Sequence, residues 1–526
     1  MKQVIYNCKT FLIALSILAL PLSSCSKDKD SEPGNKADQT EQTSDNEAKI
    51  TADVDKINFE SADGGSVEIT INSTKEFYTL SAKDSWVILS DIAGAKGEMK
   101  FKISASINTG ETRTSELYVT SNTNKLTIPV SQVGATPAAA LYENFNTSPK
   151  PADKTGMDHT ATELVALMGY GWNNGNALEI PDGETAWGNP PITKKLIDAV
   201  YAAGFRNIRI PCCWGTRTSK STGKILDSYM ARIKEVVDWV FAKGDMYVVV
   251  NCHWDGGWLE NNIGNTVDVK INARQKAIWE QIATTFQDYD ERLLFAGTNE
   301  PCLEGNINAM QVNTLVTYLQ TFIDAVRSTG GKNAYRTLIV QGIGADAKKA
   351  MQNMPFSKLP KDNVENRMML EVHYYDPSDF CLMDKDGQWG AGTTMKYYWG
   401  SQKSSSNTKR NSTWALESDV QKTFQDLKKA YCDKGVPVYI GECSPHHLLA
   451  SSVSDLDQEL HDASIREFLK VTFGAMHSNG IIPVYWDNGY VNQNNASGLF
   501  DRRAGSLYYK DFMNSIREAF GQEDLE

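Results

Sequence analysis

Short apolar segments alternate with amphipathic ones from about residue 154 onward, and this alternation restricts the folds open to the chain. The apolar segments, each of strand length, are LVALMGYGW, RNIRIPCCW, MYVVVNCHW, LLFAGTNEP, TLIVQG, MMLEVHYYDP, VPVYIGEC and IIPVYWDNG. Helical periodicity marks segments between them, at 192–203, 229–243, 273–286, 312–328, 420–434 and 458–477. Strands joined by helical crossovers predict an α/β fold, a (β/α)8 TIM barrel over residues 154–522. The alternative is an open doubly wound sheet, but no strand leads into a GxGxxG turn.

Two of the expected strands end in a glutamate. Glu300 follows LLFAGTN, and Glu442 follows VPVYIG. A carboxylate beside a buried strand costs stability unless a neighbour or a ligand satisfies it, and an arginine partner would suffice for either one alone. Two carboxylates at the same end of a barrel are also the minimum equipment of a retaining or inverting glycosidase.

Polar and aromatic residues follow six of the eight expected strands. They are Arg209, the run from His253 to Trp258, Asn299-Glu300, the run from His373 to Asp376, Glu442, and Trp486-Asp487-Asn488. Each has a structural explanation of its own, such as a core ion pair for Arg209 or packing for Trp486. Because barrel enzymes bind substrate at the C-terminal ends of the strands, the whole set indicates an active site. The loop-rich insertions 381–411 and 444–455 follow strands and should flank it.

This set of residues resembles that of glycoside hydrolase family 5, whose members are retaining β-glycanases. The likeness covers about residues 155–520, and MGYGWNNGNALE resembles the GWNLGNxLD opening of a subfamily rich in endo-β-1,4-glucanases and xyloglucanases. The segment CHWDGGW departs from the family, because Trp254 stands where a second histidine is common. That change puts the usual sugar contact in doubt and offers a stacking face instead.

The resemblance implies a role for each of these residues. Glu300 would be the acid/base and Glu442 the nucleophile, which Arg209 and Tyr375 would keep ionised and aimed. Substrate-binding residues would be Arg209, His253, Asn299, His373, Tyr375, Trp486, Asn173, Trp172, Trp254, Trp258 and Asn488. Double displacement through a covalent glycosyl-enzyme would retain configuration, with the carboxyl groups roughly 5–5.5 Å apart. Xyloglucan is the favoured substrate; mannan and mixed-linkage β-glucan remain alternatives, since loops set specificity.

The N-terminal third has a different organisation. Residues 1–24 have the charged start and short apolar core of a signal peptide, and Leu22-Ser23-Ser24-Cys25 resembles a bacterial lipobox, so we expect lipid attachment at Cys25. Residues 25–49 lack large apolar residues and should form a disordered tether. Alternating runs in residues 50–134 predict a small, immunoglobulin-like β-sandwich. That stretch resembles the BACON modules of Bacteroidetes proteins, as a spacer or a glycan binder, and residues 135–153 would be a linker. We therefore expect an outer-membrane lipoprotein at the cell surface.

Charge, cysteine content and missing motifs argue against other classes of protein. The formal net charge of −12 argues against a nucleic-acid partner, which requires a basic surface. Cysteines 212, 213, 252, 302, 381, 432 and 443 form no CxxC motif, so we expect structural thiols. A metal hydrolase using Glu442 with His446 and His447, or His253 with Asp255, is disfavoured by the lack of an HxH or HExxH motif. A non-catalytic glycan-binding protein is disfavoured because both carboxylates remain. We expect a monomer that requires no metal or cofactor.

Overall fold

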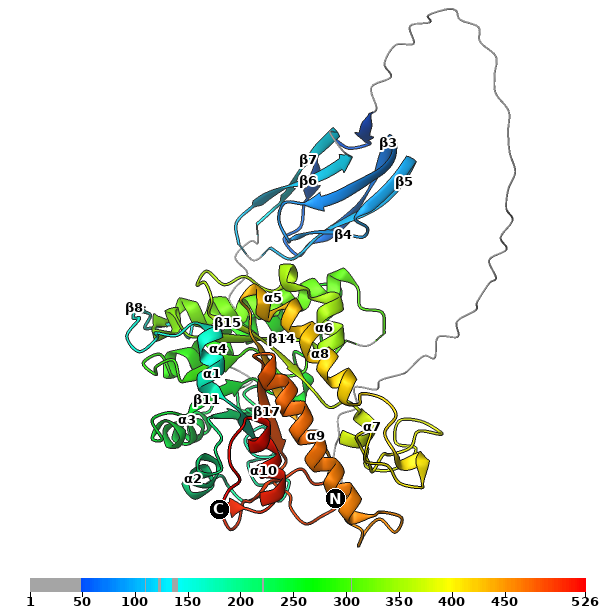
Figure 1. Cartoon of the computed structure of the whole chain (residues 1–526). Coiled ribbons are helices and arrows are strands. Elements are labelled where there is room, and N and C mark those ends of the chain that lie inside the picture. Colours follow the sequence, from blue (N-terminus) through cyan, green and yellow to red (C-terminus); the bar gives the residue numbers. More distant parts are fainter. Residues whose placement is uncertain (1–48, 109, 122–123, 135–140, 220–221, 304) are drawn as a thin grey trace, which may run out of the picture.

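The computed structural model describes residues 49–526 except 109, 122–123, 135–140, 220–221 and 304. Figure 1 shows an all-β module followed by a larger domain of strands and helices. The expected signal peptide, lipidation site and tether lie outside the described residues, as does the ATPAAA segment of the expected linker. Within the described ranges, we find no helix with the length and apolar character needed to cross a bilayer.

The N-terminal module contains seven strands around one apolar core. They are β1 (Ile50–Ala52), β2 (Ile57–Phe59), β3 (Gly65–Ala82), β4 (Val87–Leu89), β5 (Ala93–Ala105), β6 (Arg113–Ser121) and β7 (Asn124–Gln132). The long strand β3 pairs with β5 along its length and with β6 near its end, so the strands form one connected sheet in the order β2-β7-β6-β3-β5-β4, with β1 on β3. Alternation in β3 and β5 buries Ile69, Phe101 and Ile103. The expected all-β character is thereby observed.

The second half of the expected linker follows the barrel surface. Strand β8 (Lys150–Ala152) pairs with β13 (Gly330–Gly331), and the Phe145 N–H donates to Glu280 at 3.2 Å. The ammonium of Lys150 lies 2.6 Å from the Asp288 carboxylate. These contacts hold the segment that leads into the catalytic domain.

The eight expected barrel strands are present, and all neighbouring pairs are parallel. They are β9 (Gly171–Asn174), β10 (Asn207–Ile210), β11 (Tyr247–Asn251), β12 (Leu293–Ala296), β14 (Leu338–Asp346), β15 (Met368–His373), β16 (Val438–Cys443) and β17 (Ile482–Asp487). Strand β17 closes the barrel on β9. The TIM-barrel prediction is confirmed. A two-stranded hairpin, β18 (Phe500–Asp501) with β19 (Ser506–Leu507), follows the barrel.

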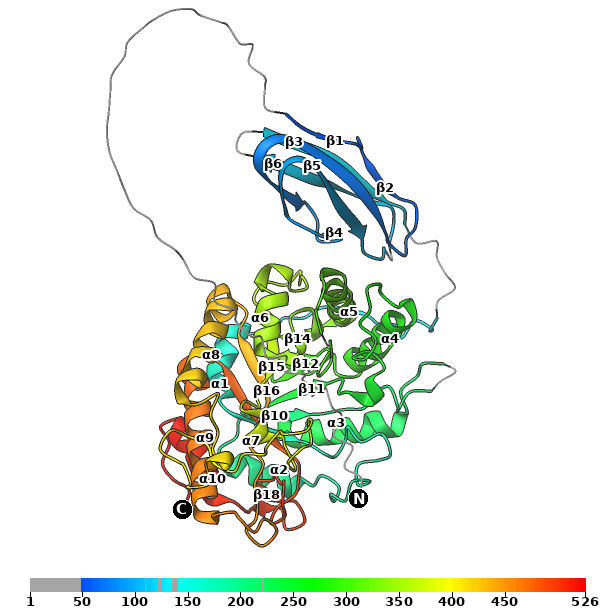
Figure 2. The same ribbon diagram turned by 90° about the vertical axis from the view of Figure 1, so that its right-hand side faces the viewer.

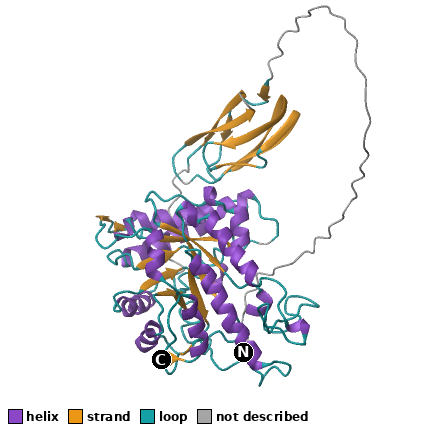
Figure 3. Ribbon diagram, viewed as in Figure 1, coloured by secondary structure: helices purple, strands orange, loops and turns teal. Residues whose placement is uncertain are grey.

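Helices surround the barrel strands (Figures 2 and 3). They are α1 (Ala161–Met168), α2 (Lys194–Ala202), α3 (Asp227–Phe241), α4 (Val269–Thr285), α5 (Ala309–Ser328), α6 (Ala347–Asn353), α7 (Ser378–Cys381), α8 (Glu417–Ala430), α9 (Gln458–Ser478) and α10 (Lys510–Ala519). Apolar residues of these helices pack on the outward side chains of the strands, and this outer core is the larger of the two layers of the domain.

One strand prediction is partly wrong. The LVALM part of LVALMGYGW belongs to helix α1, and only Gly171–Asn174 is a strand. Thr160 and Glu163 form a capping box that starts the helix. Leu164 and Met168 pack against barrel-interior residues, including Val249, so the helix is apolar for the same reason that a buried strand is.

Candidate active site

Alternation along β15 places two ionisable residues inside the barrel. Met369 belongs to the interior core, and Glu371 and His373 follow it on the same face. Both are almost completely buried. Gly441 on neighbouring β16 provides the space for Glu371, because a Cβ at position 441 would lie 1.9 Å from Glu371 Oε1.

Glu442 projects from β16 into the same interior. The register of β16 against β17 shifts between Ile440 and Cys443, and such an irregularity can redirect a side chain. The Glu442 carboxylate accepts from Arg209 Nη1 at 3.0 Å and from the Tyr375 hydroxyl at 2.9 Å. Burial raises the pKa of Glu442, while His373 and Arg209 oppose that rise by stabilising the carboxylate.

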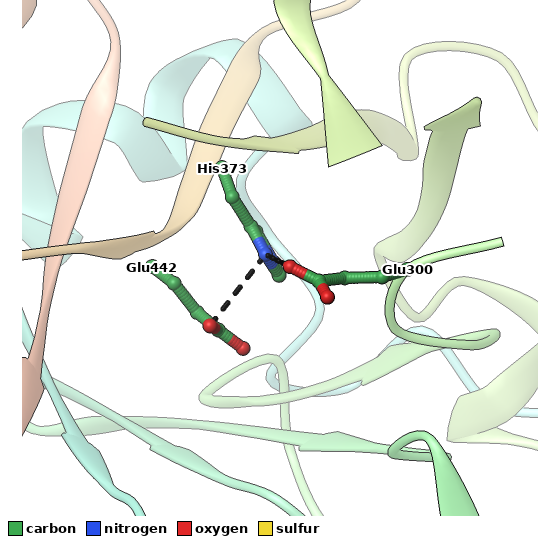
Figure 4. Close-up of side chains that lie close together, drawn as sticks. All are labelled: Glu300, His373 and Glu442. Carbon is green, nitrogen blue, oxygen red and sulfur yellow. Dashed lines mark hydrogen bonds and ion pairs between the residues drawn. The ribbon is translucent and has the colours of Figure 1, made fainter. Parts of the chain in front are cut away.

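Glu300 lies just beyond β12 and faces the same imidazole. His373 Nδ1 is 2.7 Å from Glu300 Oε1 and 3.6 Å from Glu442 Oε2 (Figure 4). One oxygen of each glutamate and a His373 nitrogen all lie within 4.8 Å of one another. The side chain of Glu300 is 45% exposed and that of Glu442 only 8%, so Glu300 is the more accessible to solvent.

His373 carries a positive charge in this environment. Burial disfavours the imidazolium, but the carboxylates of Glu442, Glu300 and Glu371 more than reverse this and raise the pKa of His373 from 6.5 to about 10. A protonated imidazole donates from both nitrogens, which suits its position between carboxylates.

Glu371 is a buried third carboxylate that the sequence analysis missed. Its Oε1 lies 2.9 Å from Arg209 Nε and 3.3 Å from His373 Nε2, and its Oε2 accepts from Gln341 at 2.6 Å. The Arg209 guanidinium keeps the pKa of Glu371 below its usual range despite burial. The available signal was a charged residue within the apolar segment MMLEVH, two positions before a histidine.

Arg209 organises the centre from beneath. It is fully buried, and besides the two glutamates it donates to Asn173 Oδ1 at 3.0 Å and Asn299 Oδ1 at 2.6 Å. Asn173 is also fully buried, with its amide nitrogen donating to the Gly441 carbonyl. Both side chains lie buried beneath the carboxylates, and their direct contact with substrate stays a prediction. The Asn299 side-chain oxygen is occupied by Arg209, so its amide nitrogen is the group left to offer a ligand.

Comparison with known proteins agrees with this geometry. A family model described as cellulase (glycosyl hydrolase family 5) matches residues 172–492. The chain belongs to glycoside hydrolase family 5.

Several relatives of this family 5 chain carry names that state a substrate. The xyloglucan-specific endo-beta-1,4-glucanase BoGH5A of Bacteroides ovatus is 34% identical, covering 84% of this chain and 86% of the relative. Endoglucanase A of Paenibacillus barcinonensis is 32% identical over 72% of this chain and 95% of its own length. Among solved structures, the Bacteroides ovatus GH5 xyloglucanase in complex with a XXXG heptasaccharide has a TM-score of 0.65 at 30% identity, covering 90% of this chain and all (100%) of that one. A ruminal metagenomic xyloglucan-specific β-1,4-glucanase, XEG5B, reaches 0.63 at 36% identity, covering 70% and 98%.

Four expected aromatic contacts of this family 5 enzyme fall into two groups. Trp254, Trp258 and Trp486 are partly exposed, and Trp486 stacks on His253 with a ring-centroid distance of 5.8 Å and an interplanar angle of 10°. Trp172 is fully buried among the outer core residues, with its indole N–H donating to Asp487. Alternation in β9 turns Trp172 toward the helices, so the structure leaves it no exposed face for the expected sugar platform.

Two further expected contacts have structural partners. Asn488 is buried, and its side-chain oxygen accepts from the N–H groups of Tyr490 and Ser497, so it shapes the loop after β17. His253 lies against Asn251, and burial keeps the pKa of His253 well below 6.5, so its ring is neutral.

The loops after β15 and β16 pack on each other. Their shared apolar cluster comprises Met383, Met395, Tyr397, Tyr398, Leu448 and Leu456. His446 faces Asp384 across this contact, and His447 pairs with Asp462. These histidines therefore do not join Glu442 in the metal site considered above.

Proposed function

We propose that the protein is a retaining endo-β-1,4-glucanase whose substrate is xyloglucan. The observation that carries the mechanism is the short separation of Glu300 and Glu442. One carboxylate oxygen of each lies within 4.8 Å of the other and of a His373 ring nitrogen. Retaining glycosidases hold their carboxyl groups about 5–5.5 Å apart, whereas inverting enzymes need roughly 6.5–9.5 Å to admit a water. An oxygen-to-oxygen separation of at most 4.8 Å is on the retaining side of this division, so it favours double displacement.

In the first step, Glu442 attacks the anomeric carbon while the bond to the leaving oxygen breaks. Glu300 transfers its proton to that oxygen, and a covalent glycosyl-enzyme forms on Glu442. Arg209 and Tyr375 hold the two oxygens of Glu442, which fixes the carboxylate for attack.

In the second step, a water takes the place of the departed sugar. Glu300, now ionised, accepts a proton from this water as its oxygen attacks the anomeric carbon, and the bond to Glu442 breaks. The His373 imidazolium lies 2.7 Å from Glu300 and 3.6 Å from Glu442, so it stabilises whichever carboxylate bears the charge. The Asn299 amide is suited to donate to the sugar 2-hydroxyl, a contact that strengthens in the transition state.

The substrate assignment rests on the relatives and on the loops. Two matched proteins are named as xyloglucan-specific and cover most or all of their own length in the comparison. Partly exposed Trp254 offers an apolar face to glucose rings. The Arg274 guanidinium lies 4.7 Å from the ring centroid of Trp258, so only the opposite face of Trp258 is left for a sugar. Mannan and mixed-linkage β-glucan use the same catalytic groups and are the outcomes that the substrate test must separate.

The location is a separate proposal. The lipobox-like Leu-Ser-Ser-Cys ending at Cys25 supports anchoring of a monomeric enzyme at the outer cell surface through lipid on Cys25. The all-β module would then be a BACON-like spacer. In it, Trp86 packs partly buried against the module core under the Arg113 guanidinium, 4.5 Å from the ring centroid, which limits its use as a sugar platform.

The function is tested by product analysis on xyloglucan, barley β-glucan, carboxymethylcellulose and mannan. We expect rapid cleavage of xyloglucan to large oligosaccharides, with Glu442→Ala and Glu300→Ala each reducing the rate by at least about 10³-fold. Proton NMR should show the β-anomer as first product. A preference for mannan would overturn the substrate assignment. If the α-anomer forms first, the retaining mechanism is wrong, and full activity of Glu442→Ala would mean that the active site is wrongly placed.

A further inference from the structure

Glu260 is a buried carboxylate that the mechanism above does not use. It lies in the loop between β11 and α4, two residues beyond Trp258, and is 2% exposed. Its partners belong to the segment that carries the acid/base.

One oxygen of Glu260 accepts three hydrogen bonds from consecutive residues. The Thr298 hydroxyl donates at 2.9 Å, the Asn299 N–H at 2.8 Å and the Glu300 N–H at 2.7 Å, all to Oε1. The carbonyl of Glu260 also accepts from the Cys302 N–H at 3.2 Å. The backbone from residue 298 to residue 302 is therefore fastened to this one residue.

The same segment is held from a second side. The Thr298 N–H donates to Gln341 Oε1 at 2.9 Å, and Gln341 donates in turn to Glu371. Two buried carboxylates thus restrain the chain beyond β12, one of them through Gln341. Glu371 also fixes Arg209, whereas the side-chain contacts of Glu260 within the centre are confined to residues 298–300.

The position of Glu260 is energetically demanding. Burial, followed by the nearby charge of Glu300, raises the pKa of Glu260 to about 7. Its Oε2 is buried with no hydrogen-bond partner within the described part of the chain. A group placed at such cost next to a catalytic carboxyl indicates a requirement for exact placement of that carboxyl.

We propose that Glu260 is a positioning residue that holds the Asn299–Glu300 backbone so that the Glu300 carboxyl reaches the glycosidic oxygen. The assignment rests on the proposed acid/base role of Glu300. Displacement of a catalytic group by about 1 Å can cost on the order of 10²-fold in rate, so the loss of these hydrogen bonds has a measurable effect.

Two substrates with different leaving groups distinguish positioning of the acid from general support of the fold. A β-1,4-glucan oligosaccharide needs protonation of its leaving oxygen, whereas a dinitrophenyl β-cellobioside expels dinitrophenolate without it. For Glu260→Ala, we expect kcat/KM on the oligosaccharide to fall by about 10–100-fold, and by less than about 3-fold on the dinitrophenyl substrate. Glu260→Gln, which retains an acceptor oxygen, should recover most of the loss.

Two variants provide the controls. Asp255→Asn removes another buried carboxylate of the same loop, one that accepts the N–H groups of Gly215 and Thr216, and its effect should be equal on both substrates. Glu300→Ala must itself lose far more kcat/KM on the oligosaccharide than on the dinitrophenyl substrate. If it does not, the proposed acid/base role of Glu300 fails, independently of Glu260. If Glu300→Ala behaves as stated but Glu260→Ala loses both activities equally, or neither, the positioning role is overturned.

Discussion

Replacement of Glu371 by glutamine tests the charge balance of the centre. The substitution keeps the shape of the side chain but removes a negative charge 3.3 Å from His373 Nε2 and 2.9 Å from Arg209 Nε. Since this carboxylate helps to hold the proton on His373, we expect the pKa of His373 to fall in Glu371→Gln.

The size of the effect follows from the pKa of His373. The rise from 6.5 to about 10 corresponds to about 5 kcal/mol in favour of the imidazolium, at roughly 1.4 kcal/mol for each pKa unit. Glu442, Glu300 and Glu371 supply this together against the opposing effect of burial. If the three carboxylates contribute equally, Glu371 accounts for at least about one pKa unit of this rise. The pKa of His373 should therefore drop to about 9 or lower in Glu371→Gln.

The assay is an NMR titration of protein with labelled histidine rings, with the His373 signal assigned from its loss in His373→Asn. The chain has only seven histidines, so the signals are few. As a matched control, Glu291→Gln removes a carboxylate paired with His159 just before β12 and should leave the pKa of His373 unchanged. An unchanged His373 pKa in Glu371→Gln would refute the reasoning.

Three further predictions concern stability. First, the raised pKa of His373 contributes stability that is fully present below about pH 6.5 and is lost as pH rises toward 10, so the unfolding free energy measured with urea should decline across that window more in wild type than in His373→Asn. Second, Gly441→Ala should lower the free energy of unfolding by about 1–3 kcal/mol because the added Cβ would meet Glu371. In helix α9, the Cβ added by Gly474→Ala would have only contacts near 3.8 Å, so that substitution should be neutral or stabilising. Equal effects of the two substitutions would contradict the steric argument. Third, Trp172→Ala should cost about 3–5 kcal/mol in thermal or urea unfolding, whereas partly exposed Trp258→Ala should raise KM for glucan with a smaller fall in Tm; the reverse pattern would mean that their placement is wrong.

The barrel and its two principal carboxylates could be predicted because they depend on local pattern. Runs such as LLFAGTNEP and VPVYIGEC encode a buried strand and place a glutamate at its C-terminal end. A barrel gathers those ends whatever the details of packing, so Glu300 and Glu442 could be brought together before any contact was known. The LVALM segment shows the limit of the same argument, because a buried helix and a buried strand are equally apolar.

The roles of individual neighbours depended on which face of a strand they occupy. Trp172 and Asn173 are adjacent in sequence, yet one packs among the helices and the other holds Arg209. If the strand were shifted by one residue, Trp172 would point into the barrel and Asn173 toward the helices. Neither residue type shows which of the two side chains points inward. The register shift before Cys443, which accompanies the inward orientation of Glu442, left no mark in the sequence either.

The sequence by itself determined the fold class, the family resemblance and the chemical types available at the site. Only the tertiary structure decided that Glu371 completes the charge balance, that His373 is protonated and that Glu260 fastens the acid/base segment. The reason is physical: pKa values and hydrogen bonds depend on distances between residues far apart in the chain. Arg209 and Glu442 are 233 positions apart, yet Arg209 Nη1 lies 3.0 Å from Glu442 Oε1. Packing of the whole barrel sets those distances, and a local pattern of residue types does not contain them.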